Sequence, residues 1–318
     1  MLMIVDGNSV GHAANSATRL SAGGKPTQAI FGTLNTIRDL IVKFKPSRVM
    51  VLWDGRAQWR YDLYPDYKAK RTLDPDKKPK PYEIKQQKSR EEYHEQRPDI
   101  VRGLSLLGIT QILPQEDEAD DLAGYFTRTI SDGEIVLVSR DHDWLQLVKK
   151  NVTWFNPIDN ETVKHSTFET YTGYKHASQF IAEKALVGDS SDFIKGVPGI
   201  GKTAAPLILT HYRGGVAELL QEVEAAGDAW EPPIDGLKRY RKKIIELGLN
   251  RDGARDIFYR NVKLMSLVDA PAPRKGTTSV IKDKINVDDF MEFCEEFAFY
   301  SIARKSEEWL EPFVEMRR

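Results

Sequence analysis

Nine carboxylates fall in five short clusters along the sequence, and most of these clusters lie just past an apolar run. They are Asp6, Asp54, Glu118, Asp120, Asp121, Asp141, Asp143, Asp189 and Asp192. Because like charges repel, a fold that gathers these groups at one place needs divalent cations to hold it together. The pattern therefore predicts a Mg²⁺ or Mn²⁺ site that acts on phosphate groups.

Three of these acids follow predicted strands. The apolar runs at residues 2–5, 48–53 and 135–138 end close to Asp6, Asp54 and Asp141, respectively. A helical pattern over 27–44 separates the first two runs, and this order implies a right-handed crossover and a parallel sheet. Ligands of such sheets bind beyond the carboxyl ends of the strands, so we expect the three aspartates at one edge. Helix capping would explain one such aspartate, but three are hard to explain as caps alone.

The rest of the pattern predicts an α/β core followed by a helical region. Strand patterns at 109–113 and 152–155, and a helix at 119–130, complete a central, mostly parallel sheet flanked by helices, which we place at residues 1–165. Helical spacing then recurs at 166–172, 178–188, 203–212, 236–248, 252–263 and 287–297. We therefore expect a helical region over 166–318, with an exposed loop at 228–235 and a polar loop at 270–278.

The total charge conceals a strongly basic segment. The 318 residues carry a net charge of −1, which counts against a uniformly basic nucleic-acid binder. Residues 68–90, however, contain nine Lys and Arg against three Asp and Glu. Such a segment beside an acidic cluster suits a polyanion that is held electrostatically while metal ions act on it. Because residues 68–107 separate two acidic strand ends, we expect them to form a basic helical cover over the site.

Several classes of protein are excluded by composition. The single cysteine, Cys294, excludes an internal disulfide and a cysteine metal cage, and we expect it in the core. No apolar stretch approaches the ~18 residues of a membrane span. The start, MLMIVDGNSV, lacks the basic region of a signal peptide. We therefore expect a cytoplasmic, monomeric protein that works where the genome is.

Residues 53–71, WDGRAQWRYDLYPDYKAKR, bring cations and tyrosines directly after an acidic strand end. The plain interpretation is a surface loop. The functional interpretation is that Arg60, Lys68 and Arg71 reach a phosphate. One of the nearby tyrosines, such as Tyr67, would stack on a base or sugar.

The segment GVPGIGKT, residues 196–203, fits two different structures. Its spacing matches a P-loop, in which the glycines, Lys202 and Thr203 would bind a nucleotide. A P-loop needs a strand immediately before it, whereas residues 180–187 repeat at helical spacing. The alternative, which we favour, is a hairpin between two helices whose glycine amides hold a nucleic-acid phosphate. The preceding Asp189 and Asp192 would then bring metal ligands onto this DNA-binding element.

Together these residues resemble the 5′-nuclease family, which includes flap endonucleases and the 5′-nuclease domain of bacterial DNA polymerase I. The resemblance extends to about residue 265. Its motifs are Asp6-Gly7-Asn8, Trp53-Asp54-Gly55, Pro65-Asp66-Tyr67-Lys68-Ala69-Lys70-Arg71, Glu118-Ala119-Asp120-Asp121, Ser139-Arg140-Asp141-His142-Asp143 and Gly188-Asp189-Ser190-Ser191-Asp192, followed by Gly196-Val197-Pro198-Gly199-Ile200-Gly201. Motifs in the family order are far more specific than any one of them. With no polymerase domain following, the chain looks like the stand-alone form of many bacteriophages.

The resemblance implies a PIN-like 5′-nuclease core with a helical cover and a helix–three-turn–helix element at about 188–212. It implies hydrolysis of phosphodiesters near 5′ ends of branched duplex DNA (flaps, nicks and RNA–DNA primers) in replication or repair, with two Mg²⁺ or Mn²⁺ ions. The tighter metal site would consist of Asp6, Asp54, Glu118, Asp120 and Asp141, and the second of Asp121, Asp143, Asp189 and Asp192. Lys68 and Arg71 would contact the scissile phosphate.

The resemblance also assigns the contacts to uncleaved DNA. These would come from Arg60, Tyr67, Lys70, Gly199, Gly201, Lys202 and Thr203, with a K⁺ ion at Val197 and Ile200. Three positions depart from the family: Ala13 and Phe193 replace a common arginine and asparagine, and Lys202 follows Gly201 directly. Two alternatives stay open, an ATP-binding protein that uses residues 196–203 and a DNA-binding protein of this fold without catalysis.

Overall fold

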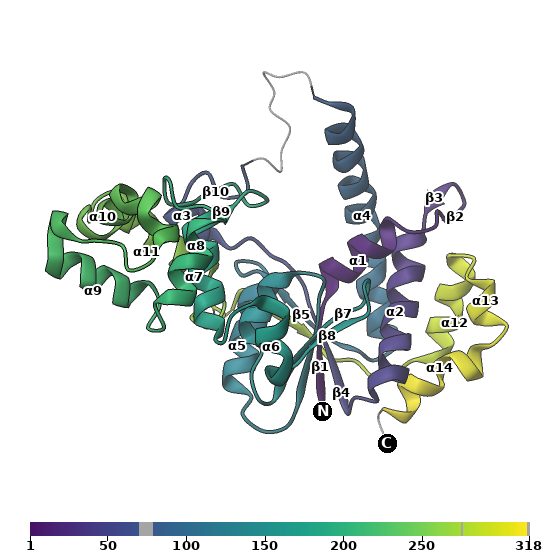
Figure 1. Ribbon diagram of the computed structural model, residues 1–318. Coiled ribbons are helices and arrows are strands. Elements are labelled where there is room, and N and C mark those ends of the chain that lie inside the picture. Colours follow the sequence, from purple (N-terminus) through teal and green to yellow (C-terminus); the bar gives the residue numbers. More distant parts are fainter. Residues whose placement is uncertain (70–78, 275, 317–318) are drawn as a thin grey trace. The chain divides into compact units, whose positions relative to one another are not determined.

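A computed structural model describes residues 1–69, 79–274 and 276–316 (Figure 1). The chain divides into two compact units. The first consists of Met1–Ala57, Leu73–His165 and Ala270–Arg318, and the second of Gln58–Thr72 and Ser166–Asp269.

A seven-stranded sheet in the order β11-β5-β4-β1-β6-β7-β8 forms the centre of the first unit. Its strands are β1 (Leu2–Asp6), β4 (Arg48–Leu52), β5 (Thr110–Pro114), β6 (Ile135–Val138), β7 (Val152–Asn156), β8 (Glu161–Val163) and β11 (Thr278–Ile281). The five central strands pair in parallel, and the edge strands β8 and β11 pair antiparallel with their neighbours. This confirms the α/β class and the mostly parallel sheet expected from the sequence.

Helices flank this sheet (Figure 1). They are α1 (Gly7–Asn15), α2 (Gln28–Phe44), α4 (Pro81–Leu106), α5 (Ala119–Thr129), the 3-10 helix η2 (His142–Leu147), α12 (Val287–Glu296), α13 (Tyr300–Ala303) and α14 (Ser306–Glu315), with a short hairpin of β2 (Ser21–Ala22) and β3 (Lys25–Pro26). Met3 and Val5 of β1 join the core with α1, α2 and α4, and the intervening Ile4 is equally buried. A strand covered on both faces must be apolar throughout, which is why a continuous apolar run precedes Asp6.

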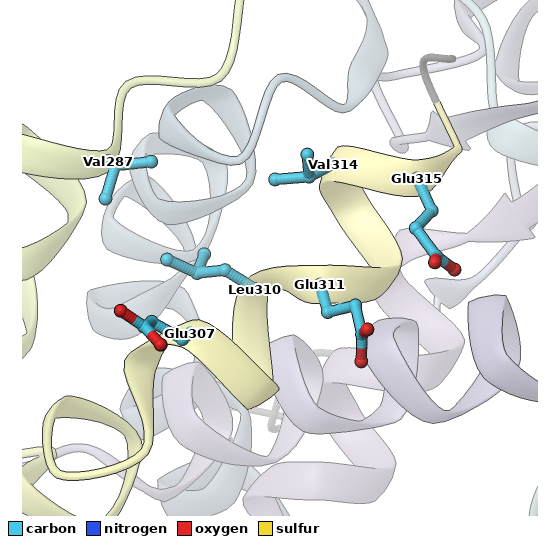
Figure 2. A pocket seen from close by; sticks show the side chains of 6 residues that line it. All are labelled: Val287, Glu307, Leu310, Glu311, Val314 and Glu315. Atoms are coloured by element: carbon cyan, nitrogen blue, oxygen red, sulfur yellow. The ribbon is translucent and has the colours of Figure 1, made fainter.

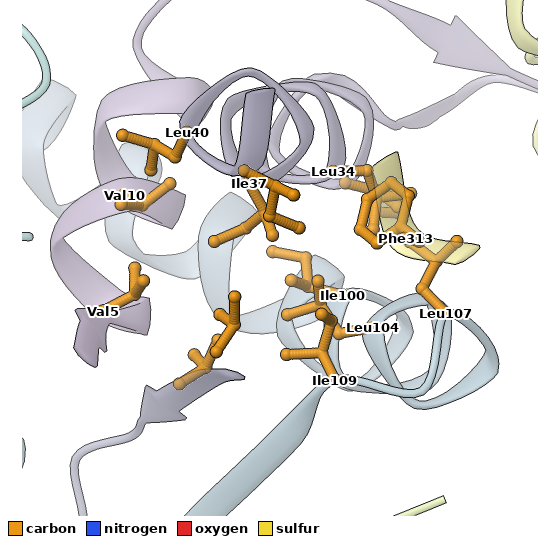
Figure 3. Close-up of a cluster of buried hydrophobic side chains, with 14 of the residues drawn as sticks. Val5, Val10, Leu34, Ile37, Leu40, Ile100, Leu104, Leu107, Ile109 and Phe313 are labelled. Atoms are coloured by element: carbon orange, nitrogen blue, oxygen red, sulfur yellow. The ribbon is translucent and has the colours of Figure 1, made fainter. Parts of the chain in front are cut away.

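The core of the first unit reaches from the sheet to the C-terminal helices (Figure 3). Leu34 and Ile37 of α2 pack in one cluster with Ile100 of α4 and Phe313 of α14. Residues 270–318, which the sequence pattern placed in the helical region, therefore group with the first unit. Two contacts hold them there: β11 pairs with β5, and α12–α14 bury aromatic side chains in this core. Cys294 is buried in α12, as expected.

The second unit is mainly helical. Its elements are α3 (Gln58–Leu63), α6 (Phe168–Thr172), α7 (Ala177–Val187), β9 (Gly188–Asp189), β10 (Ile194–Lys195), α8 (Ala204–His211), α9 (Val216–Ala226), η4 (Gly227–Ala229), η5 (Asp235–Tyr240), α10 (Arg241–Leu249) and α11 (Ala254–Met265), and the 3-10 helix η3 (His165–Thr167) precedes α6. The loop after η4 was expected to be exposed, and for Trp230 that expectation is wrong. This indole is 1% exposed and donates to Glu222 at 3.0 Å, because its large apolar surface favours burial once the N–H has an acceptor.

Helices α12 and α14 form a hollow of about 370 Å³, whose lining side chains are drawn in Figure 2. Its lining consists of Val287, Glu307, Leu310, Glu311, Val314 and Glu315. None of these residues was predicted to bind metal or DNA, and three glutamates disfavour a phosphate backbone. Among the helices that the structure describes, none is long and apolar enough to cross a membrane.

Candidate functional site

The carboxyl ends of three adjacent strands bring acids of the first unit together. Asp6 ends β1, and Asp54 and Asp141 follow the neighbouring strands β4 and β6. Glu118 and Asp120 stand at the start of α5. Asp54 and Asp141 contribute to the pKa of Asp6, and all four other acids contribute to that of Asp120. These five carboxylates therefore lie within electrostatic reach of one another.

Asp6 is buried between two donors. Its Oδ1 accepts from the Ser9 amide and its Oδ2 from the Ser139 hydroxyl, each at 2.8 Å. Burial, followed by the charge of Asp54, raises the pKa of Asp6 to about 7, although both hydrogen bonds oppose the shift. Asp6 thus caps α1 and faces other acids at once, so capping does not exclude a role as a ligand.

Asp54 is held from two other parts of the chain. The amide of Ala119, the first residue of α5, donates to its Oδ1 at 2.9 Å, and the side-chain amide of Asn8 donates to its Oδ2. The next residue must be small, because a Cβ on Gly55 would lie 2.4 Å from the carbonyl oxygen of Pro114. Close packing of β4 against the loop after β5 therefore fixes where Asp54 stands.

Asp120 accepts a hydrogen bond from a buried tryptophan. Trp144 of η2 donates through its indole Nε1 to Asp120 Oδ1 at 2.6 Å. Burial is the largest cause that raises the pKa of Asp120 well above its ordinary value, and the neighbouring acids, first Asp141, add to it. A neutral, rigid donor thus orients this carboxylate without cancelling its charge.

Hydrogen bonds to nearby backbone amides also hold the acids at the starts of α5 and η2. The Glu118 amide donates to Asp121 Oδ2 at 3.0 Å, so Asp121, predicted for the second metal site, is turned toward the N-terminus of its own helix. Asp141 caps η2 by accepting from the amide of the half-buried Asp143 at 2.8 Å. These bonds fix the acids in place before any cation binds.

Four supporting residues were missed in the sequence: Asn8, Tyr93, Ser139 and Trp144. Asn8 and Ser139 lie inside quoted motifs, yet Ser139 reaches Asp6 across 133 positions of the chain. It also accepts from the Asp141 amide at 2.9 Å, so one hydroxyl connects two acids. Spacing along the sequence contains no signal for such a contact.

In the second unit, Asp189 ends β9 and Asp192 lies in the turn between β9 and β10. Asp189 accepts from Lys184 Nζ at 3.2 Å and from the Ser191 hydroxyl at 2.6 Å. Burial would raise the pKa of Asp189, but Lys184 and the Ser191 hydrogen bonds outweigh it and lower that pKa. The Lys68 amide donates to the Asp192 carbonyl at 2.8 Å, so this lysine and the two acids are neighbours.

Two predicted DNA contacts point into the second unit instead. Arg60 is 2% exposed and donates to the Leu264 carbonyl at 3.0 Å, and Tyr67 is 3% exposed. Both side chains pack the interior of this unit, and neither is presented to solvent. Lys70 and Arg71 lie outside the described residues.

Within the predicted element at 188–212, residues 188–203 form the hairpin that joins α7 to α8. Val197 and Ile200 are buried, and the Val197 amide donates to the Leu186 carbonyl at 2.8 Å. The tip residues Gly199, Gly201, Lys202 and Thr203 are exposed. Before Gly196 stands the two-residue β10, which pairs antiparallel with β9, whereas a P-loop follows a strand of a parallel sheet. The geometry therefore favours the helix–turn–helix interpretation.

The acids of the first unit fit a hard divalent cation by their chemistry. Within 1–69, 79–274 and 276–316, no three His, Cys, Asp or Glu side chains are spaced to hold one metal ion between them. The five carboxylates nevertheless offer the oxygen ligands that Mg²⁺ and Mn²⁺ prefer. Burial raises the pKa of Asp6 and Asp120, and the repulsion between the acids adds to this rise; a bound cation relieves the repulsion.

The mostly parallel sheet, with acids gathered at the carboxyl ends of its central strands, places this chain among α/β proteins whose ligands bind at that edge. Residues 1–175 match the family described as 5′-3′ exonuclease, N-terminal resolvase-like domain. The chain belongs to this family of nucleases.

Relatives support the same assignment. A 5′-3′ exonuclease of Aquifex aeolicus is 30% identical over 274 residues, which are 84% of this chain and 83% of the relative. Flap endonuclease Xni of Shewanella piezotolerans is 32% identical over 217 residues, 66% and 78% of the two chains. The chain spans only 24–32% of the length of the DNA polymerase I relatives from Chloroflexus aurantiacus and Streptococcus pneumoniae.

The fold also resembles a solved structure. The bacteriophage T5 D15 flap endonuclease, in a complex with DNA and metal ions, has a TM-score of 0.65 to this chain. The alignment covers 99% of this chain and 98% of the other at 21% identity. This likeness establishes the fold.

Proposed function

We propose that this chain is a metal-dependent 5′-nuclease. It would hydrolyse phosphodiester bonds near the 5′ ends of branched, nicked or flapped duplex DNA, as a flap endonuclease and 5′→3′ exonuclease in replication or repair, such as primer removal. The observation that carries the proposal is the group of mutually repelling carboxylates at the carboxyl edge of the sheet, in a chain of this family. The T5 relative, which binds DNA and metal ions, supports the same substrate class and cofactor.

The chain's own residues would divide the work. Asp6, Asp54, Glu118, Asp120 and Asp141 would hold the cation in the first unit. A bound divalent cation lowers the pKa of a water molecule and stabilises the leaving oxygen. Ser139, Asn8 and Trp144 orient these carboxylates, each through one hydrogen bond.

Residues of the second unit would act on the DNA itself. Lys68 and Arg71 would neutralise charge that develops on the scissile phosphate. The exposed tip of the hairpin, Gly199 to Thr203, would hold the phosphate backbone of uncleaved duplex through backbone amides, as a helix N-terminus does. The roles of Asp189 and Asp192 as ligands, and of K⁺ at Val197 and Ile200, remain proposals from the sequence.

Cleavage of defined DNA tests this function. We expect the protein to cut 5′-labelled flap and nicked duplexes in Mg²⁺ and to lose this activity in EDTA. Asp54→Ala should reduce cleavage at least ~1,000-fold, because it removes one of the five acids that would hold the cation. Asp288→Asn, which neutralises an exposed acid on α12, is the matched control and should cleave like the wild type. Normal cleavage by Asp54→Ala, or cleavage unaffected by EDTA, would refute the proposal.

A further inference from the structure

Helix α4 changes character at Tyr93. Residues 81–92 include no buried residue, and in Figure 1 this half of the helix extends beyond the other elements of the first unit. Tyr93 is 1% exposed, and the buried residues of α4 follow from there. The Asn15 side chain of α1 already donates to the Ser89 carbonyl at 2.8 Å, and Tyr93 is the first residue of α4 whose side chain is buried.

Tyr93 is connected through hydrogen bonds to Asp54, an acid of the candidate metal site. The Tyr93 hydroxyl donates to Asn8 Oδ1 at 2.8 Å, and the Asn8 amide donates to Asp54 Oδ2. One turn further along α4, Arg97 donates to the backbone carbonyl of Asp54 at 3.0 Å. Helix α4 thus holds both the carboxylate and the backbone of this residue.

The Tyr93 hydroxyl determines the orientation of the Asn8 side-chain amide, which has an acceptor oxygen at one end and a donor NH₂ group at the other. With Tyr93 donating to its oxygen, Asn8 must present its NH₂ group to Asp54; the opposite orientation would place an oxygen against a carboxylate. The ring of Tyr93 has a separate, packing role. It lies 3.9 Å from the His12 ring, centroid to centroid, and fills the space beside Gly11, where a Cβ would come within 2.5 Å of it.

We propose that Tyr93 is a positioning residue that, through Asn8, holds Asp54 in the orientation in which it binds a divalent cation, and so couples α4 to metal binding. This inference rests on the proposed function, because it takes Asp54 as a metal ligand. Partners one step behind a ligand commonly change metal affinity 10–100-fold when they are removed. Such coupling is reciprocal: a cation that fixes Asp54 also stabilises α4 around Tyr93.

Removal of one oxygen atom tests the proposal. Tyr93→Phe keeps the ring and deletes the hydroxyl, and the Mn²⁺ dissociation constant of the DNA-free protein, measured by electron paramagnetic resonance, should rise about 5- to 50-fold. Tyr82→Phe is the matched control, since this hydroxyl on the exposed part of α4 donates to Glu83 at 3.0 Å. It should leave the dissociation constant unchanged. An unchanged constant for Tyr93→Phe, with an unchanged circular-dichroism spectrum, overturns the proposal.

A double-mutant cycle separates positioning from general loosening of the fold. If Tyr93 acts through Asn8, Tyr93→Phe should not lower the affinity for Mn²⁺ any further in a protein that already carries Asn8→Ala. If instead the two substitutions raise the dissociation constant independently, so that their effects multiply, the proposal is overturned.

Hydrogen exchange tests the coupling to α4. Mn²⁺ should slow exchange of the α4 amides around residues 93–97 in the wild type but not in Tyr93→Phe, and equal slowing in both proteins contradicts the coupling. If Asp54→Ala bound Mn²⁺ as tightly as the wild type, Asp54 would not be a metal ligand, and this result would instead refute the proposed function.

Discussion

At the scale of single residues, the candidate site is held together by groups that do not cancel its charge. Asp6, Asp54 and Asp120 accept from a hydroxyl, amides and an indole. These neutral donors fix direction and leave the repulsion between carboxylates in place. The metal-free protein therefore stores an electrostatic cost at the edge of its sheet.

Burial of Asp6, together with this repulsion, predicts how the stability of the metal-free protein depends on pH. The pKa of Asp6 is raised to about 7 in the folded chain, from an ordinary value near 3.8. The folded state thus binds a proton more tightly than the unfolded state, so the stabilisation is complete below pH ~4 and is lost as pH rises through 7. Asp6→Asn removes the charge but keeps a cap for α1. In EDTA at pH 7.5 it should raise the free energy of unfolding by roughly 1–4 kcal/mol.

Urea unfolding at pH 5 and pH 7.5 measures this effect. The difference between variant and wild type should be larger at the higher pH, and Asp288→Asn, on the exposed start of α12, should show no such trend. A variant that is less stable than the wild type at both pH values would contradict the prediction. Saturating Mg²⁺ should reverse the order, because the cation stabilises the charged form.

The sequence identifies the acids but not the partners that hold them. Asp6, Asp54 and Asp141 were found because parallel strands deliver their ends to one edge, a rule that needs only local patterns. Ser139, Asn8 and Trp144 were missed because their hydrogen bonds join distant positions. Likewise, Arg60 can be buried because it donates to the Leu264 carbonyl on α11, and the local sequence around Arg60 does not predict so distant an acceptor.

At the scale of elements, the hairpin between α7 and α8 depends on close approach of the backbone. A Cβ on Gly196 would lie 2.2 Å from the carbonyl oxygen of Val187, and one on Gly188 would lie 2.4 Å from the Gly196 amide nitrogen. Gly201 differs, since nothing lies within 4 Å of its added Cβ. The glycines of one motif therefore serve two purposes: some permit the turn, and Gly201 leaves the tip open.

Two alanine substitutions distinguish these purposes. Gly196→Ala should destabilise the hairpin by about 2 kcal/mol or more, because the clash is with backbone that cannot swing away. Gly201→Ala, the control in the same loop, should change stability by no more than about 0.5–1 kcal/mol. Hydrogen exchange of the α7 and α8 amides measures the local free energy of opening. Equal protection in both variants would show that the turn at Gly196 can relax.

Elements were predictable where one face is buried and the pattern is long. Helix α2 and strand β6 match their expected residues to within one position, since regular apolar spacing dictates both. Helix α1 was missed because its buried residues, although they recur at helical spacing, are mostly small or polar and give little apolar signal. Strand β11 was missed because it is a short, largely exposed edge strand. Helix α9 has ordinary helical spacing, so its omission has no physical cause.

At the scale of the whole molecule, sequence order does not determine which unit a segment joins. Residues 270–318 follow the helices of the second unit, yet they supply β11 and a cluster of aromatic residues to the first. Phe290, Trp309 and Phe313 stack with ring centroids 5.2–5.3 Å apart. Apolar spacing predicts that α12 buries a face, but not which surface receives it.

Stability of the sheet therefore depends on helices far from it in sequence. Phe313 is 0% exposed in the shared core, and Phe313→Ala should cost about 3–5 kcal/mol. Tyr300→Ala is the matched control, since this aromatic residue of α13 is 59% exposed and should cost less than about 0.5 kcal/mol. Hydrogen exchange read element by element locates the loss: Phe313→Ala should speed exchange in β1, β4 and α2 and leave α7–α11 unchanged. Faster exchange confined to α7–α11 would show instead that the C-terminal helices stabilise the second unit, and the core shared by α2, α4 and α14 would be refuted.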